Sequence, residues 1–307
     1  MDLLCYAVGT LLVWVVRIMP LTWMARIGRA GGWLAWKLDR RHRETALRNL
    51  TQCFGSEKTP GEIRAIAREN LMRIGEAFAS GAKTSMLSRA RLGPRVKLVN
   101  IDRLEGPPEA VIKPNRVVAV GHFGNFELYA RIMESVLGFR GVTTYRSLNQ
   151  PGLDRVLHEV RQRANTCTYY ERRKEAEALR REMNNHGVVL GLLCDQNGGD
   201  SGVVLPFFGR PCSTSTAPAL FALRYNCTLH TAICRRVALA QWEIVVGEEI
   251  PTHDPQGEPR TKADIMLDVN QAFEAAIRRD PCNWFWVHNR WKPGVGRPPR
   301  KTAAAPE

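Results

Sequence analysis

Short runs of strand-forming residues alternate with helical stretches from residue 96 onward, and this alternation limits the possible folds more than any other feature of the chain. The expected strands are Val96–Val99, Val117–Val120, Val142–Tyr145, Thr168–Tyr170, Val188–Cys194 and Leu229–Arg235. The expected helices among and after them are Phe126–Leu137, Gly152–Arg163, Arg173–Asn184, Ala217–Tyr225 and Lys262–Arg279. The pattern predicts an α/β fold with a mostly parallel or mixed central sheet flanked by helices.

Two of the expected strands are almost wholly apolar, and each is followed by polar residues and glycines. Gly121–Glu127 follows Val117–Val120, and Asp195–Gly199 follows Val188–Cys194. Strands buried on both faces have this apolar character, and the ligands of open parallel sheets bind beyond the carboxyl ends of the strands. We therefore expect a functional site in these two loops.

His122 is the strongest single candidate for a catalytic residue. Glu127 follows it by five residues, a spacing that can bring a carboxylate of the first helical turn beside the imidazole. A carboxylate on one ring nitrogen fixes the tautomer and makes the other nitrogen a better base. The alternative is a buried His122 bonded to the backbone, with Glu127 as a favourable charge near a helix start.

The chain lacks the motifs of covalent or cofactor-dependent catalysis. It contains no G-x-S-x-G elbow, no P-loop, no G-x-G-x-x-G turn after a strand and no H-E-x-x-H helix, and its eight cysteines form no C-x-x-C pair. We expect reduced, mostly buried cysteines, no metal and no resident cofactor. A histidine base without a protein nucleophile fits direct attack by a substrate hydroxyl that His122 deprotonates.

The N-terminus is apolar enough to suggest a membrane. Leu3–Val16 contains fourteen residues without a charge, whereas a full span needs roughly 20 apolar residues, with about 17 as the lower limit. Pro20 is expected to end or kink this helix, and the stretch that follows interleaves tryptophans with basic residues, as membrane interfaces favour. We expect residues 1–40 to form a membrane anchor that either spans or lies on the bilayer; a buried N-terminal helix is the alternative.

The net charge of +14 indicates an anionic partner. Basic residues follow the apolar run and only Asp2 precedes it, so the positive-inside rule keeps the body of the protein in the cytoplasm. No zinc-finger, RNP-like or helix-turn-helix pattern supports nucleic acid binding. We expect membrane lipids as partners, no nucleic acid, and a monomer.

The remaining chain divides into a catalytic domain and a tail. Thr59-Pro60-Gly61-Glu62 has the pattern of a capping box and should start a helix that ends near Gly81. We expect an α/β domain over residues 41–293. Residues 294–307 are rich in proline, alanine and basic side chains and are expected to form a disordered tail.

Several segments, taken in order, resemble one bacterial enzyme family. They are the apolar N-terminus, the basic segment Arg40–Leu50, the motif GHFGNFE at Gly121–Glu127, the pair Asp195-Gln196, the motif PFFGRP at Pro206–Pro211 and the end Trp286–Lys292. With these residues the chain resembles the bacterial lipid A biosynthesis (late) acyltransferases and the related phosphatidylinositol mannoside acyltransferases. The resemblance implies a glycerolipid-acyltransferase-like fold at the inner membrane, facing the cytoplasm.

The resemblance also implies roles for individual residues. His122 would be the general base for a lipid-linked hydroxyl that attacks the thioester of an acyl carrier protein or acyl-CoA, which are co-substrates. Glu127 matches the motif carboxylate and Asp195 a later acidic position, and either could contact the imidazole. The remaining expected substrate-binding residues are Asn125, Arg146, Arg163 and Gln196. Arg163 is preferred over Arg161 within Arg161–Arg163.

Other interpretations stay open at this point. A non-catalytic lipid-binding protein could keep the fold, and a thioesterase or lipid hydrolase could use the same histidine to activate water. Each candidate arginine could be an ordinary exposed cation. The acceptor could be a lipid A precursor, another glycolipid, an ornithine-type lipid or a lysophospholipid, and the acyl chain length and the donor are also open.

Overall fold

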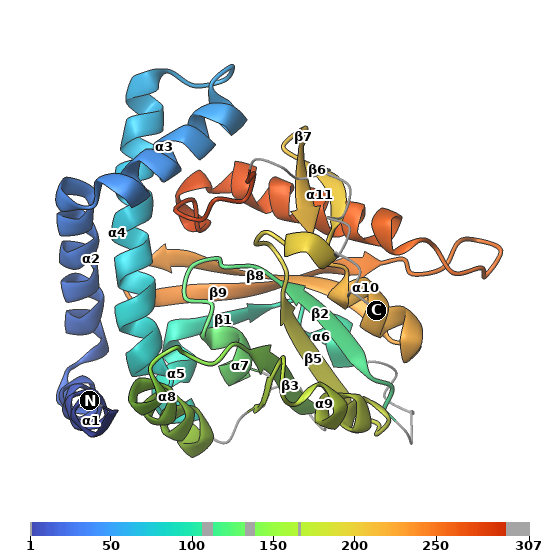
Figure 1. Cartoon of the computed structure of the whole chain (residues 1–307), viewed down its shortest axis with the longest axis horizontal. Coiled ribbons are helices and arrows are strands. Elements are labelled where there is room, and N and C mark those ends of the chain that lie inside the picture. Colours follow the sequence, from blue (N-terminus) through green and yellow to red (C-terminus); the bar gives the residue numbers. More distant parts are fainter. Residues whose placement is uncertain (1, 106–112, 133–138, 165–166, 293–307) are drawn as a thin grey trace, which may run out of the picture.

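A mixed seven-stranded sheet forms the centre of the molecule (Figure 1). The computed structural model describes residues 2–105, 113–132, 139–164 and 167–292. The strand order is β1-β9-β8-β2-β5-β3-β4, and every neighbouring pair is parallel except β8 and β9. The strands are β1 (Val96–Val99), β2 (Arg116–Val120), β3 (Arg140–Tyr145), β4 (Thr168–Glu171), β5 (Val188–Leu193), β8 (Thr228–Ala238) and β9 (Gln241–Ile250). The predicted α/β fold with its mostly parallel sheet is confirmed.

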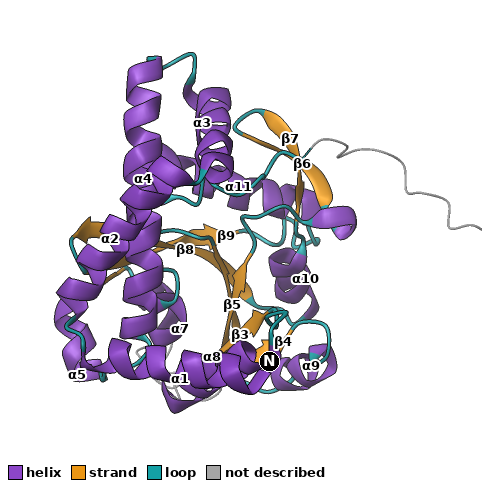
Figure 2. Cartoon of the chain, turned by 60° about the vertical axis from the view of Figure 1, so that its left-hand side comes forward, coloured by secondary structure: helices purple, strands orange, loops and turns teal. Residues whose placement is uncertain are grey.

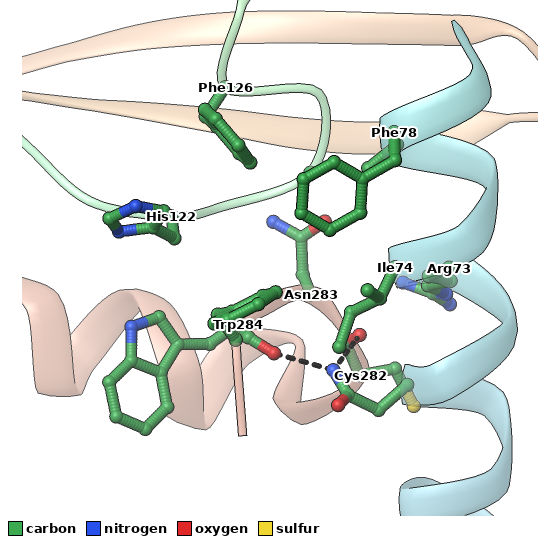
Figure 3. A pocket seen from close by; sticks show the side chains of 12 residues that line it. Arg73, Ile74, Phe78, His122, Phe126, Cys282, Asn283 and Trp284 are labelled. Carbon is green, nitrogen blue, oxygen red and sulfur yellow. Dashed lines mark hydrogen bonds between the residues drawn. The ribbon is translucent and has the colours of Figure 1, made fainter. Parts of the chain in front are cut away.

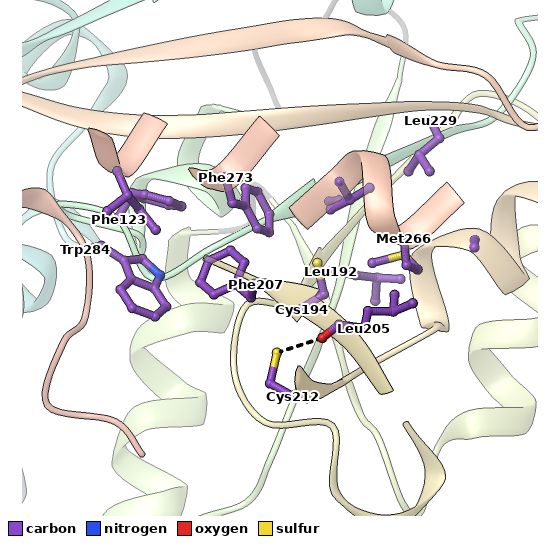
Figure 4. Packing of buried hydrophobic residues seen from close by; sticks show 14 of the residues in the cluster. Phe123, Leu192, Cys194, Leu205, Phe207, Cys212, Leu229, Met266, Phe273 and Trp284 are labelled. Atoms are coloured by element: carbon purple, nitrogen blue, oxygen red, sulfur yellow. Dashed lines mark hydrogen bonds between the residues drawn. The ribbon is translucent and has the colours of Figure 1, made fainter. Parts of the chain in front are cut away.

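Both faces of the sheet are covered, which explains the apolar central strands. In β2, Val117 and Ala119 belong to one buried cluster, and Val118 and Val120 belong to a second cluster on the opposite face. The first face packs against α10 (Ala217–Arg224) and α11 (Lys262–Arg279). The second packs against α5 (Arg89–Leu92), α6 (Asp102–Glu105) and α7 (Leu128–Ile132). Figure 4 shows side chains of α11 and the central strands meeting in the first cluster.

Two structural features were not predicted. The segment that contains the PFFGRP motif forms a hairpin of β6 (Val203–Phe207) and β7 (Arg210–Thr214). Its two turn residues both have positive φ, 51° at Phe208 and 67° at Gly209, as a tight hairpin turn requires. The second missed element is β9, which makes the sheet mixed.

The N-terminal quarter of the chain is helical and lies against one side of the sheet domain (Figure 2). It contains α1 (Asp2–Ile18), α2 (Leu21–Leu38), α3 (Arg40–Phe54) and α4 (Pro60–Thr84). The helix break falls at Pro20, and the predicted capping box at Thr59 and Glu62 starts α4. Helix α2 packs along α4, whereas α1 crosses to α8 (Pro151–Ala164), where Tyr6 donates to Glu159. Helix α9 (Ala176–Met183) lies against β4 and buries Leu179 and Met183.

Helix α1 does not support the expected membrane-spanning anchor. None of the helices found in the described residues is both long enough and apolar enough to cross a bilayer. The physical reason lies in its length and composition, since α1 has 17 residues and carries charges at both ends. The end of the predicted helix Phe126–Leu137 and the predicted disordered tail 294–307 lie outside the described residues.

Candidate active site

The loops after β2 and β5 meet because these two strands are parallel neighbours. His122 lies two residues beyond β2 and Asp195 two residues beyond β5. One carboxylate oxygen of Asp195 lies 2.8 Å from His122 Nδ1, and the other accepts the backbone N–H of His122 at 2.8 Å. The sheet edge thus brings together a histidine and an acid that are 73 residues apart in sequence.

Asp195 is fully enclosed, and further donors hold it in place. Its carboxylate is 1% exposed and also accepts the indole N–H of Trp284 at 2.8 Å. Burial opposes ionisation of Asp195, but the neighbouring His122 and the hydrogen bonds from His122 and Trp284 hold its pKa below its usual value. The acid is therefore a carboxylate at neutral pH and can stabilise a protonated His122. Trp284 was not among the residues expected from sequence.

The other ring nitrogen of His122 is left to accept a proton. Gln196 Nε2 lies 3.4 Å from His122 Nε2. The imidazole is 17% exposed and borders a cavity of about 10 Å³, close to the space that one water needs. Aromatic rings line it. The ring centres of Phe126 and Phe285 lie 5.0 and 5.7 Å from that of the imidazole, and Figure 3 shows Phe126 and Phe78 beside His122.

Of the two acids that could contact the imidazole, Glu127 lies elsewhere. Its carboxylate pairs with Arg161 Nη2 of α8 at 2.8 Å, and Asp195 takes the place beside His122. Arg161 also lies over the Tyr169 ring, 4.9 Å from its centre. The structure therefore selects Arg161 as the partner of the motif carboxylate, whereas the side chain of the preferred Arg163 lies outside the described residues.

Two further expected site residues lie away from the cavity lining. Asn125 is buried, and its amide donates to Thr84 at 3.1 Å, so it ties the histidine loop to α4. Arg146 is exposed just beyond β3. Gly124 is the motif position with a steric requirement, because its φ is +48° and an added Cβ would lie 2.7 Å from the Cys234 carbonyl oxygen.

The described residues offer no alternative nucleophile or metal cluster near this pair. Cys194 precedes Asp195, and burial raises the pKa of its thiol far above neutrality. All eight cysteines are free thiols, and a buried thiol of raised pKa is unreactive. No group of three or more potential metal ligands occurs in the part of the chain that the structure describes.

A histidine bonded to a buried carboxylate at the carboxyl edge of a parallel sheet is an arrangement that enzymes use for general-base catalysis. The sequence comparisons identify the class. Residues 2–293 match the family described as "Bacterial lipid A biosynthesis acyltransferase". The chain belongs to this family and is an acyltransferase.

The curated relatives are distant but cover almost the whole chain. A lipid A biosynthesis acyltransferase of Haemophilus influenzae is 26% identical over 92% of this chain and 88% of its own length. The lipid A biosynthesis palmitoleoyltransferase of Escherichia coli is 24% identical, covering 94% and 90%, and the lauroyltransferase of the same organism is 22% identical, covering 92% and 90%.

Proposed function

We propose that this protein transfers a fatty acyl group from a thioester, carried by acyl carrier protein or CoA, to a hydroxyl of a lipid A precursor. The observation that carries the proposal is the His122–Asp195 pair, with Nδ1 held at 2.8 Å and Nε2 beside a cavity. The names of the relatives support the choice of acceptor, since they act in lipid A biosynthesis.

The proposed reaction proceeds in one transfer step without an acyl-enzyme. His122 Nε2 takes the proton of the acceptor hydroxyl, and the hydroxyl oxygen forms a bond to the thioester carbonyl carbon. The carbon–sulfur bond then breaks, and the thiol leaves with a proton returned by His122. Asp195 stabilises the imidazolium that forms between these events. Gln196 lies close enough to the same nitrogen to orient a substrate oxygen.

We further propose that the protein works on the cytoplasmic surface of the inner membrane. Helices α1 and α2 expose large apolar side chains, among them Leu3, Leu11, Trp14, Trp23 and Trp33. In α2 these lie beside cations: Arg26 over Trp23 and Lys37 over Trp33, at 5.5 and 5.6 Å. Apolar side chains next to basic ones are typical of helices that lie in the interface of anionic membranes.

Replacement of the histidine tests the proposal. His122→Ala should remain folded and should lose about 10²–10⁴-fold in transfer of labelled acyl groups to extracted lipid. The matched control is His186→Ala at an exposed position, which should retain full activity. Full turnover of His122→Ala would remove His122 as the base, and release of free fatty acid without acylated lipid by the unmodified protein would indicate a hydrolase.

A further inference from the structure

A groove of about 810 Å³ lies between α3 and the C-terminal segment 285–292. One stripe of α3 forms a wall of it: Arg41, Glu44, Thr45 and Arg48 all line the groove. These positions are three, four and seven residues apart, so they share one helix face. The opposite face of α3 is buried in the core, so the helix presents its basic stripe to the groove.

The walls of the groove are held together by a buried side chain. The Asn49 amide donates to the carbonyl oxygens of Trp286 and His288, both at 2.8 Å. Asn49 is 1% exposed, so these bonds are shielded from water. The groove is therefore a fixed part of the fold.

The groove carries an excess of positive charge that the protein itself does not neutralise. Arg41, Arg48 and Lys292 are exposed, and within the described residues none of them forms an ion pair. The remaining charges are paired: Arg40 with Glu44 at 2.5 Å and His42 with Asp39 at 2.6 Å. Three unpaired cations around one concave surface favour a multiply charged anion.

The groove also adjoins the catalytic cavity. Phe285 lines both of them, and the centre of its ring lies 5.7 Å from that of the His122 imidazole. A ligand in the groove can therefore extend past Phe285 toward His122. The groove begins directly after the exposed apolar end of α2, where Trp33, Leu34 and Leu38 are about half or more exposed.

We propose that this groove binds a phosphate group on the head group of the lipid acceptor and so places the acceptor hydroxyl at His122. The inference rests on the proposed function. Arginine matches phosphate oxygens with paired N–H donors, and the adjacent apolar end of α2 provides room for the acyl chains of the same molecule. An acidic carrier protein would also be attracted by the charge, but that attraction does not need a concave surface.

Binding of a soluble phosphate lipid tests this proposal without requiring turnover. The probe is dihexanoyl phosphatidic acid. It is compared with dihexanoyl phosphatidylcholine, whose phosphate is esterified with choline and whose negative charge is offset by the choline ammonium group. For the full chain with Arg41→Gln and Arg48→Gln, we expect at least a tenfold higher Kd for phosphatidic acid. The control Arg89→Gln with Lys97→Gln removes equal charge at exposed positions outside the groove and should leave the Kd unchanged.

Lys292→Gln, on the opposite wall, provides a second variant that leaves α3 intact. It should also raise the Kd for phosphatidic acid. An unchanged Kd in both groove variants would overturn the proposal. So would a loss of binding to acyl carrier protein with phosphatidic acid binding retained, since the groove would then dock the donor. The binding measurement needs no turnover, so it is independent of the test of the proposed function. Activity of His122→Ala would overturn the proposed function but would not affect the conclusion on phosphate binding in the groove.

Discussion

Trp284 shows how a single residue supports the His122–Asp195 pair. Its indole N–H donates to Asp195, and its backbone carbonyl oxygen accepts from the Asn70 amide, so both its side chain and its backbone are held. It is 1% exposed and lies among other aromatic rings. Trp284 is a positioning residue, since its bond reaches the imidazole only through the carboxylate.

We expect Trp284→Phe to lower kcat about 10–100-fold, because a hydrogen bond to a charged group contributes about 1.5–3 kcal/mol. The acceptor KM should change less than twofold, since the substrate does not contact the indole. Steady-state kinetics measures both parameters. The matched control is Trp291→Phe, which removes an indole bond to the Phe207 carbonyl in the same aromatic cluster and should retain kcat. Equal losses in the two variants would contradict the positioning role.

His288 makes stability depend on pH. Burial lowers its pKa to about 4 from the usual 6.5, and its Nε2 accepts the backbone N–H of Asn197. The unfolded chain therefore binds more protons than the folded chain between pH 6.5 and pH 4. We expect the free energy of unfolding to fall by about 1–2 kcal/mol as the pH drops through this window, after allowance for solvent screening. In urea titrations, His288→Gln should flatten this part of the profile, and an unchanged slope would contradict the assignment.

Individual site residues could be predicted only where they follow parallel strands, since ligands bind beyond the carboxyl ends of such strands. His122, Asp195 and Gln196 follow apolar strands, so their loops could be expected to meet. Trp284 and Arg161 come from outside those loops, and no local pattern shows that an indole 89 residues away reaches Asp195. The choice between Glu127 and Asp195 as the neighbour of His122 stayed open because spacing alone does not reveal that Arg161 of α8 pairs with Glu127.

Helix α2 depends on close contact with α4. An added Cβ at Gly28 would lie 2.3 Å from the Gly75 carbonyl oxygen, so the backbones meet almost directly. We expect Gly28→Ala to lower the free energy of unfolding by about 1–3 kcal/mol, the usual range for an overpacked contact. The control is Gly31→Ala in the same helix, which meets nothing within 4 Å and should gain up to about 1 kcal/mol from better helix propensity. Thermal unfolding measures both, and two equal shifts would contradict the packing argument.

Secondary structure was predicted best where elements are long or wholly apolar. Helix α11 and strand β1 have the expected bounds, and β5 ends one residue before the expected Cys194. Strand β9 was missed because Gly247, Glu248 and Glu249 interrupt its apolar pattern. The β6–β7 hairpin was missed because Phe208 occupies a positive-φ position that usually indicates glycine or asparagine.

At the scale of the whole molecule, the proposed membrane association rests on the exposed apolar side chains of α1 and α2. We expect Leu11→Glu with Trp14→Glu to reduce binding to phosphatidylethanolamine–phosphatidylglycerol vesicles about tenfold or more, since both side chains are more than half exposed. Vesicle sedimentation measures this. Val237→Glu is the control, because Val237 is 51% exposed on β8, apart from those helices. A similar loss in the control would indicate nonspecific electrostatic repulsion.

The small size of the cavity beside His122 affects the balance between acyl transfer and hydrolysis. A space that holds about one water is too small for an acyl chain. Under the proposed function, lining rings such as Phe78 and Phe126 would therefore have to move before a thioester could reach the imidazole (Figure 3). An acyl chain that displaces these rings would occupy the space beside the imidazole and so exclude water from it. The proposed acyl thioester would then react with the lipid acceptor in preference to water.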